Sequence, residues 1–330
     1  SLEILPGGYQ ILWADDEAFE GASHLSFKLS GSGEEFGVFQ LIGNDTVSVV
    51  HTSFTNQNKG FAFARLPNST GPFVNTSTPT PGSINTQPPK ITNLVVNEFG
   101  AGSTRARDDY EEESDWIELY NMGAEPINLG WLFITDSLDN KLKQPLFNDS
   151  IPLIIPPGGY QLLWADSDPG QGLNHLDLKL SSSGESIGIF QFVGQDTVAI
   201  YSDRFNKQLS GFSSARIPNG VGPFEASLGG TPGQANTRMP LVTGLVINEI
   251  SSAKSDFVKD EFGESDDWIE LYNNSNTPIN LSGLFLTDDS GDKLKALLND
   301  NYQDWILEPG DFQVLWADEQ PLQGSTHLSL

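Results

Sequence analysis

The sequence lacks cysteine throughout its 330 residues. Disulfide bonds, thiolate metal sites and a thiol nucleophile are therefore excluded, and cysteine usage cannot indicate the redox compartment. Apolar residues never form a run of about 18, the length that a membrane-spanning helix needs. No membrane insertion is predicted.

Basic residues are also scarce. Lys and Arg together number 17, against 44 Asp and Glu, which gives a formal net charge of −27. A surface of this sign repels the phosphates of nucleic acids and the headgroups of anionic membranes. The composition therefore excludes nucleic acid as a partner, and it favours solubility and an affinity for divalent cations.

Internal repeats dominate the sequence. The string PGGYQILWAD at residues 6–15 returns as PGGYQLLWAD at 157–166 and as PGDFQVLWAD at 309–318. His24, His175 and His327 follow these strings at the same spacing, and successive histidines are 151 and 152 residues apart. A period of this length is that of a whole domain, so the sequence predicts a tandem array of domains.

The phase of the repeat predicts where the domains lie. The middle copy, 94–237, is expected to be complete; 1–86 corresponds to the C-terminal part of a domain and 245–330 to the N-terminal part. Residues 87–93 and 238–244 are predicted linkers, within the Pro- and Thr-rich flanks of the middle copy. Because residues 1–27 and 304–330 encode the same strand, we favour a continuing array over a head-to-tail polymer completed by strand exchange.

Strand signals account for most of the secondary structure. DWIELYN at 115–121 alternates Trp116, Glu118 and Tyr120 with Ile117 and Leu119, which is a strand period. Helical periodicity is missing apart from one possible turn at 140–147. Further strands are predicted at residues 9–15, 94–98, 131–135, 176–180, 187–192, 198–201 and 211–216, separated by Gly, Pro, Asn and Asp. This spacing is typical of an antiparallel sandwich, with Trp116 and Trp164 in its core.

Several motifs recur in a fixed order. They are an Asn-Glu pair after an apolar run (97–98 and 248–249), DWIELYN (115–121 and 267–273), PINL followed by an Asp (126–136 and 278–288), the PGxYQxLWAD strings, and HLxxKLSxxGE (24–34 and 175–185). In these motifs the chain resembles the lamin-tail domain family. The resemblance implies an all-β fold of tandem immunoglobulin-like β-sandwiches, in a secreted or cell-surface bacterial or archaeal protein. It implies no catalytic residues.

Two acidic loops precede the DWIELYN strings. Crowded carboxylates repel one another unless a cation lies between them, and carboxylate oxygens are the ligands that Ca²⁺ prefers. The alternative is a solvated acidic loop, since the spacing matches no EF-hand. The candidate calcium ligands are Asp108, Asp109, Glu111, Glu112, Glu113 and Asp115 in the middle copy, and Asp260, Glu261, Glu264, Asp266 and Asp267 in the third, where Asp256 also belongs to the loop.

Other polar pairs could carry chemistry. Asp15, Asp166 and Asp318 each precede a His by nine residues, but the chain offers no nucleophile motif, so a structural hydrogen bond is the favoured interpretation. Paired carboxylates such as Glu98 and Glu118 could resemble glycosidase acids. We favour solvent exposure or hydrogen bonds to loop backbones. The Trp residues could stack on sugars, although core packing is the commoner role on alternating strands.

These observations favour a structural role over catalysis. We expect a structural, non-catalytic subunit of an extracellular filament or cell-surface stalk, whose partners are copies of itself. The alternative is a calcium-dependent adhesive or carbohydrate-binding module of a larger surface protein.

Overall fold

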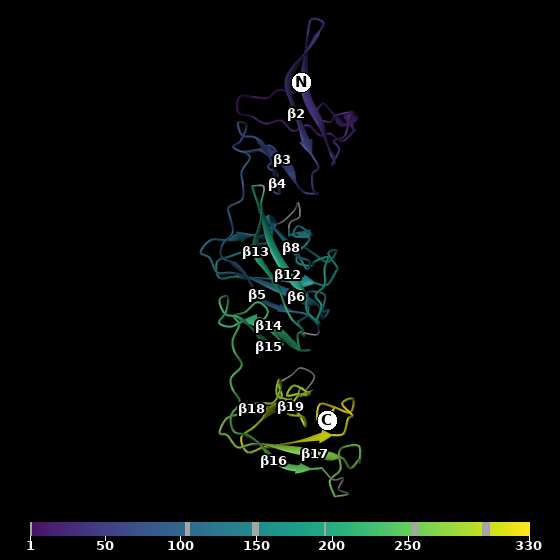
Figure 1. Ribbon diagram of the computed structural model, residues 1–330, viewed down its shortest axis with the longest axis vertical. Helices are drawn as coiled ribbons and strands as arrows, with labels where there is room; N and C mark the ends of the chain where they lie inside the picture. The colour runs from purple at the N-terminus through teal and green to yellow at the C-terminus, as the bar shows by residue number, and fades with distance from the viewer. Residues whose placement is uncertain (1, 103–105, 147–151, 195, 253–256, 299–303) are drawn as a thin grey trace. The chain divides into compact units, whose positions relative to one another are not determined.

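The computed structural model describes residues 2–102, 106–146, 152–194, 196–252, 257–298 and 304–330. Nearly all regular structure in these parts is β-strand, and the helices are two 3₁₀ turns, η1 (Ala18–Glu20) and η2 (Leu129–Trp131) (Figure 1). The predicted all-β class, consistent with immunoglobulin-like sandwiches, is confirmed. No helix in the described parts has the length and apolarity to span a membrane. Contacts divide the chain into two units, residues 1–96 with 118–206 and residues 97–117 with 207–330.

The first unit begins with an antiparallel hairpin. Strands β1 (Gly33–Ile42) and β2 (Asp45–Thr55) pair along their whole length, with a bulge between Val38 and Phe39. A second antiparallel pair follows, β3 (Ala62–Arg65) with β4 (Phe73–Thr76). Most side chains of β1 and β2 are exposed.

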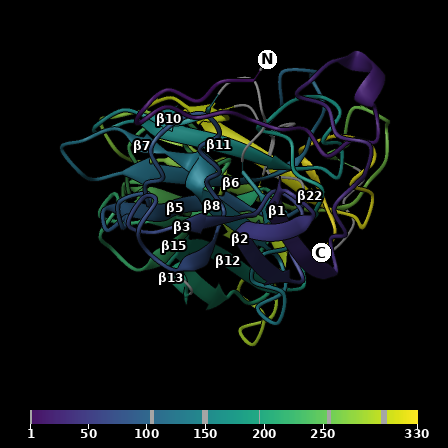
Figure 2. The ribbon, with the colours of Figure 1, turned by 90° about the horizontal axis from the view of Figure 1, so that it is seen from above.

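A four-stranded sheet in the first unit has the order β13-β12-β8-β9. Strands β13, β12 and β8 are labelled in Figures 1 and 2. Its central strand β12 is buried over residues 186–191, where Ile187, Ile189 and Phe190 are the core residues. The same unit contains a short pair, β7 (Ile127–Asn128) with β10 (Ile154–Ile155). The sheet strands are β8 (Leu132–Thr135), β9 (Gln144–Pro145), β12 (Ser186–Val193) and β13 (Asp196–Arg204).

A five-stranded sheet has the order β11-β6-β5-β14-β15. The alternation in β6 does not separate a core face from a solvent face, because Trp116, Ile117, Glu118 and Leu119 are all buried. The strand is therefore covered on both faces. Its sheet comprises β5 (Leu94–Gly100), β6 (Asp115–Asn121), β11 (Tyr160–Ala165), β14 (Phe212–Arg216) and β15 (Phe224–Leu228).

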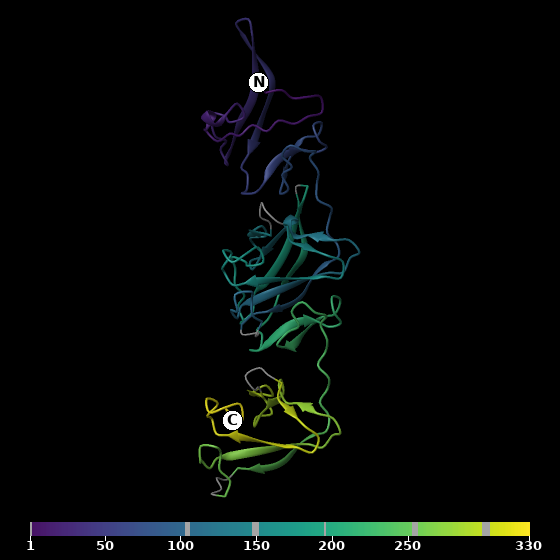
Figure 3. The same ribbon diagram turned by 180° about the vertical axis from the view of Figure 1, so that it is seen from behind.

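The third sequence copy, in the second unit, has a four-stranded sheet of order β16-β17-β22-β23. Figure 3 shows the yellow β22 beside the green β17. Leu271, Leu281 and Leu315 are among the buried residues that form its hydrophobic core. The strands are β16 (Leu245–Ser251), β17 (Asp267–Asn273), β22 (Phe312–Ala317) and β23 (His327–Leu328), with short pairs β18 (Ile279–Asn280) with β21 (Ile306–Leu307) and β19 (Phe285–Leu286) with β20 (Ala296–Leu297).

Two strand predictions are wrong. Residues 176–180 alternate buried leucines but form only isolated bridges, such as the one that pairs Asp166 with Lys179. Residues 9–15 are not a strand, although the equivalent β11 and β22 are, because the first copy has no neighbouring DWIELYN strand in the chain to pair with. The possible helical turn at 140–147 is a simple turn followed by β9, and Phe147 lies outside the described residues.

The core role of Trp164 has a measurable consequence. Its side chain is buried, with 6% exposed, whereas the equivalent Trp13 is 54% exposed. Trp164→Ala should lower the free energy of unfolding of the middle copy by about 3–5 kcal/mol, because it leaves a large cavity. Trp13→Ala is the matched control and should cost less than about 1 kcal/mol. Urea titration followed by tryptophan fluorescence and circular dichroism measures both, and equal costs would contradict the assignment.

Candidate functional site

Each sequence copy contains the expected Asp–His hydrogen bond. Asp15 and Asp166 accept hydrogen bonds from the Nδ1 atoms of His24 and His175 at 2.5 Å, and Asp318 is bonded to Nδ1 of His327. Each bond lies beside a parallel bridge between the His backbone and the Trp two residues before the Asp, such as Trp164 with His175. The Asp–His pair therefore stabilises the turn that follows each Trp-Ala-Asp string.

The acidic loop of the third copy is organised around Asp260, whose side chain is buried with 8% exposed. Its Oδ1 atom accepts backbone hydrogen bonds from Phe262 and Glu264 at 2.9 and 2.7 Å. Its Oδ2 atom is buried without a hydrogen-bond partner. Asp260, Glu264 and Asp266 each place a carboxylate oxygen within 4.8 Å of the others. Three of the five predicted ligands in this loop thus converge.

The other two predicted ligands of this loop lie apart from that group. The Glu261 carboxylate is exposed and approaches Nε2 of His327 at 3.3 Å. Asp267 is the first residue of β17, opposite Ala317 of β22. The position of Asp256 lies outside the described residues.

Pairing of β17 with β22 brings Asp318 and His327 to the same end of the sheet as the acidic loop. Asp260, Asp318 and His327 each offer a ligand atom, and these atoms lie within 4.8 Å of one another. The His327 ring is buried against Trp316 and Phe262. Burial lowers the pKa of His327, but the hydrogen bonds and charges of Asp318 and Glu261 outweigh burial and leave the pKa above its ordinary value.

The acidic loop of the middle copy has the same backbone arrangement but different side-chain chemistry. Asp108 accepts backbone hydrogen bonds from Tyr110 and Glu112 at 2.8 and 3.0 Å, as Asp260 does from the equivalent residues. Its Oδ2 atom, however, accepts a hydrogen bond from the hydroxyl of Ser114 at 3.3 Å. Asp266 occupies the position equivalent to Ser114 in the third copy, and an ionised carboxylate cannot donate such a bond.

The remaining middle-copy candidates do not gather around Asp108. Asp109, Glu111 and Glu112 are exposed. Glu113 forms an ion pair with Arg107 at 3.3 Å, and Asp115 accepts a hydrogen bond from the backbone of Gly102 at 2.5 Å. Among the described residues, the carboxylates of this loop do not by themselves form a group of three potential ligands.

A second polar cluster surrounds the Asn-Glu pair of β5. Asn97 and Glu98 are fully buried, so the expectation of solvent exposure is wrong. The expected hydrogen bonds to loop backbones are present: Asn97 accepts one from Gly220 at 2.9 Å, and Glu98 accepts one from Thr231 at 3.1 Å. The hydroxyls of Ser213 and Thr231 also donate to Glu98. Glu118 is fully buried as well.

Burial raises the pKa of Glu98, and the hydrogen bonds from Ser213 and Thr231 oppose this effect without cancelling it. Thr231 lies in the Pro- and Thr-rich flank that follows the middle copy, at residues 229–240, so this flank is partly docked on β5. Asn236 completes the attachment, because its side-chain amide donates to the backbone carbonyls of Asn97 and Arg216.

The equivalent pair in the third copy lies in a different environment. Asn248 and Glu249 of β16 are exposed, as are the apolar side chains of Val246, Ile247 and Ile250. The Asn248 amide donates to Glu270 of the neighbouring strand at 2.7 Å. The same sequence motif is therefore buried in one copy and accessible in another.

Tryptophan side chains form no exposed row suited to sugar stacking among the described residues. Trp116 and Trp164 are buried, as predicted, and Trp131 is half-buried. Trp13 is exposed.

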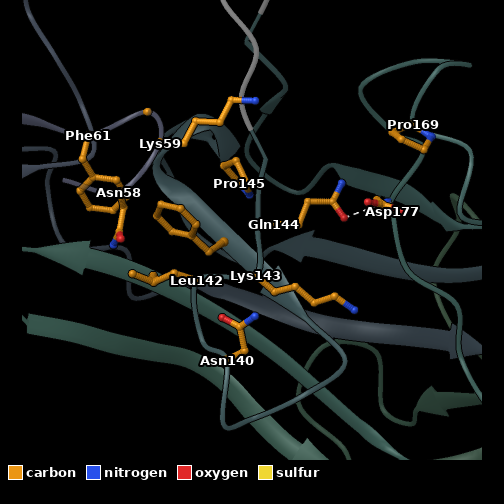
Figure 4. A pocket seen from close by; sticks show the side chains of 12 residues that line it. Asn58, Lys59, Phe61, Asn140, Leu142, Lys143, Gln144, Pro145, Pro169 and Asp177 are labelled. Carbon is orange, nitrogen blue, oxygen red and sulfur yellow. Dashed lines mark hydrogen bonds between the residues drawn. The ribbon is translucent and has the colours of Figure 1, made fainter. Parts of the chain in front are cut away.

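A pocket of about 610 Å³ lies in the first unit (Figure 4). Phe61 forms part of its wall and stacks on Phe133, with ring centroids 5.7 Å apart. Lys59 and Asp177 also line the pocket, and the Asp177 backbone donates to Gln144 at 2.9 Å. The charged side chains among the described lining residues are those of Lys59, Lys143 and Asp177.

The third sequence copy, whose sheet and turn are described above, also matches a known protein family. Residues 241–329 match the family model described as Lamin Tail Domain. The match supports an immunoglobulin-like lamin-tail domain in this part of the chain. Lamin-tail domains are a non-catalytic family. No curated protein and no solved structure matches the chain.

The sequence analysis did not place Asp318 and His327 beside the acidic loop of the third copy. The signal was present, since WAD and DWIELYN were both predicted to be strands. Pairing them in antiparallel register puts the end of one beside the start of the other.

The raised pKa of Glu98 predicts a pH effect on stability. A carboxyl whose folded pKa exceeds its unfolded value stabilises the protein below the unfolded pKa, and this contribution is lost as pH rises through the folded pKa. Relative to Glu98→Gln, the wild-type protein should therefore lose stability as pH rises from the unfolded pKa, near 4.5, through the higher folded pKa. Urea titrations of both proteins across this range measure the difference. A difference independent of pH, or one of opposite sign, would contradict the prediction.

Proposed function

We propose that the chain is a structural, non-catalytic subunit of an extracellular filament or cell-surface stalk, built from repeated lamin-tail-like β-sandwiches. The observation that carries this proposal is the recurrence of one turn-fastening Asp–His bond in all three sequence copies. Domain-sized repeats that preserve such structural bonds fit a role in building length.

The environments of the two Asn-Glu pairs support a specific contact between domains. In the middle copy the pair is held by Asn219, Thr231 and Asn236. The equivalent residues of the first copy are Asn68, Thr80 and Asn85, and they bond to one another in the same manner: Thr80 to Asn85 at 3.0 Å and the Asn85 backbone to Asn68 at 3.0 Å. This first-copy segment therefore has counterparts of Asn219, Thr231 and Asn236, whereas Ala62 stands where the Ser213 hydroxyl donates to Glu98 in the middle copy.

The exposed β16 provides the matching surface. We assign the segment that would cover β16 to a lamin-tail-like domain whose polar residues resemble those of residues 61–85. This domain is either a following domain of an array or part of another copy of this chain. Burial of Val246, Ile247 and Ile250 supplies the apolar part of the contact, and Asn248 and Glu249 supply its polar specificity.

The contact predicts self-association of the whole chain. Sedimentation velocity over a rising protein concentration should show oligomers, and negative-stain electron microscopy should show short filaments, because head-to-tail contacts that do not close give open fibres. Glu249→Ala should weaken association, because it removes the carboxylate that would accept hydrogen bonds from the covering segment, as Glu98 does in the middle copy. Asp203→Ala removes another exposed strand carboxylate, from β13, and should leave association unchanged.

A chain that stays monomeric at every concentration would refute association between copies and leave the continuing array. Equal effects of the two substitutions would refute the role of Glu249.

The converging carboxylates of the third copy favour one alternative, a calcium-dependent adhesive or carbohydrate-binding module. Calorimetric titration of the whole chain with glycans in millimolar Ca²⁺ distinguishes the two functions. The structural proposal expects no saturable heat from glycans, whereas saturable, calcium-dependent heat would favour the adhesive module.

A further inference from the structure

The third copy differs from the middle copy at one position that decides the chemistry of its acidic loop. In the middle copy the hydroxyl of Ser114 donates to Asp108 Oδ2. In the third copy Asp266 takes that position, and Asp260 Oδ2 is buried without a hydrogen-bond partner. A buried carboxylate oxygen without a donor is costly, and a neighbouring carboxylate adds repulsion.

We propose that Asp260, Glu264 and Asp266 hold a divalent cation, and that the ion is Ca²⁺. The three carboxylate oxygens lie within 4.8 Å of one another, so a single ion can contact all three. Ligands that are all oxygen, from a loop with both buried and exposed members, suit Ca²⁺, which accepts six to eight oxygens and completes its shell with water. The inference is independent of the structural role proposed above.

Two further contacts build the site from outside the loop. The side-chain amides of Gln320 and Gln323 donate to Glu264 Oε2 at 3.2 and 3.1 Å, which holds this carboxylate toward the turn after β22. The Asp318–His327 pair is buried, and its ligand atoms lie within 4.8 Å of a carboxylate oxygen of Asp260. Residues that hydrogen-bond to metal ligands in this way orient those ligands and increase the affinity for the metal.

Backbone hydrogen bonds within the loop leave one carboxylate oxygen of Asp260 available to an ion. Asp260 Oδ1 is used by two backbone donors, so Oδ2 is the oxygen left for an ion. The loop of the middle copy has the same two backbone bonds but lacks the third carboxylate, because Ser114 stands in its place. We therefore assign the cation to the third copy only.

Isothermal titration calorimetry of the whole chain with Ca²⁺ tests the site. We expect one equivalent bound after dialysis against a chelator, and a higher melting temperature in Ca²⁺, since a ligand of the native state stabilises it. Asp266→Ser converts the loop to the middle-copy chemistry and should weaken binding by roughly tenfold or more while the fold is kept. Asp289→Asn, which alters an exposed carboxylate away from this loop, is the control and should bind as the wild type does.

The reciprocal substitution in the middle copy is expected to gain a site, and a gain of binding cannot be explained by unfolding of the variant. Ser114→Asp supplies the middle copy with the missing carboxylate, beside Asp108 and Glu112, and should raise the stoichiometry from one ion to two. Absence of binding by the folded wild-type chain would overturn the proposal. So would Zn²⁺ binding that His327→Gln abolishes and Asp266→Ser leaves intact, because the ion would then belong to the Asp–His group.

Discussion

The burial of a carboxylate and an amide in the middle of β5 constrains the rest of the middle copy. Glu98 and Asn97 cannot be buried without hydrogen-bond partners, since an unsatisfied carboxylate costs more than the adjoining apolar contacts gain. Gly220, Thr231 and Asn236 supply those partners from loops more than a hundred residues away in sequence. The Pro-rich flank is thereby folded onto the strand that it covers.

The same constraint explains how one motif can serve two situations. Where the covering segment is present, the Asn-Glu pair is buried and its polar groups are satisfied. In β16 the pair is exposed, and its amide turns to Glu270 of the neighbouring strand. The exposed apolar side chains and polar pair of β16 are the basis of the proposed contact, because a partner without matching donors would leave the pair unsatisfied.

The two acidic loops differ in the hydrogen-bond donors that are available to their buried carboxylate oxygens. In the middle copy each carboxylate oxygen of Asp108 has a donor from its own loop. In the third copy the exchange of a hydroxyl for a carboxylate removes a donor and adds a charge. The two loops thus share the same two backbone hydrogen bonds and differ in the side chain at one position, Ser114 or Asp266.

The sequence by itself determined the all-β class, most strands, the core positions of Trp116 and Trp164 and the Asp–His bond, because these follow from local alternation and from a motif repeated at fixed spacing. It did not determine that β6 is buried on both faces, that residues 176–180 form only bridges, or that Glu98 is buried. Those outcomes depend on which segments cover a strand. Only the tertiary structure brought Asp318 and His327 beside Asp260, since strand register joins residues that are far apart in sequence, and no local pattern specifies register.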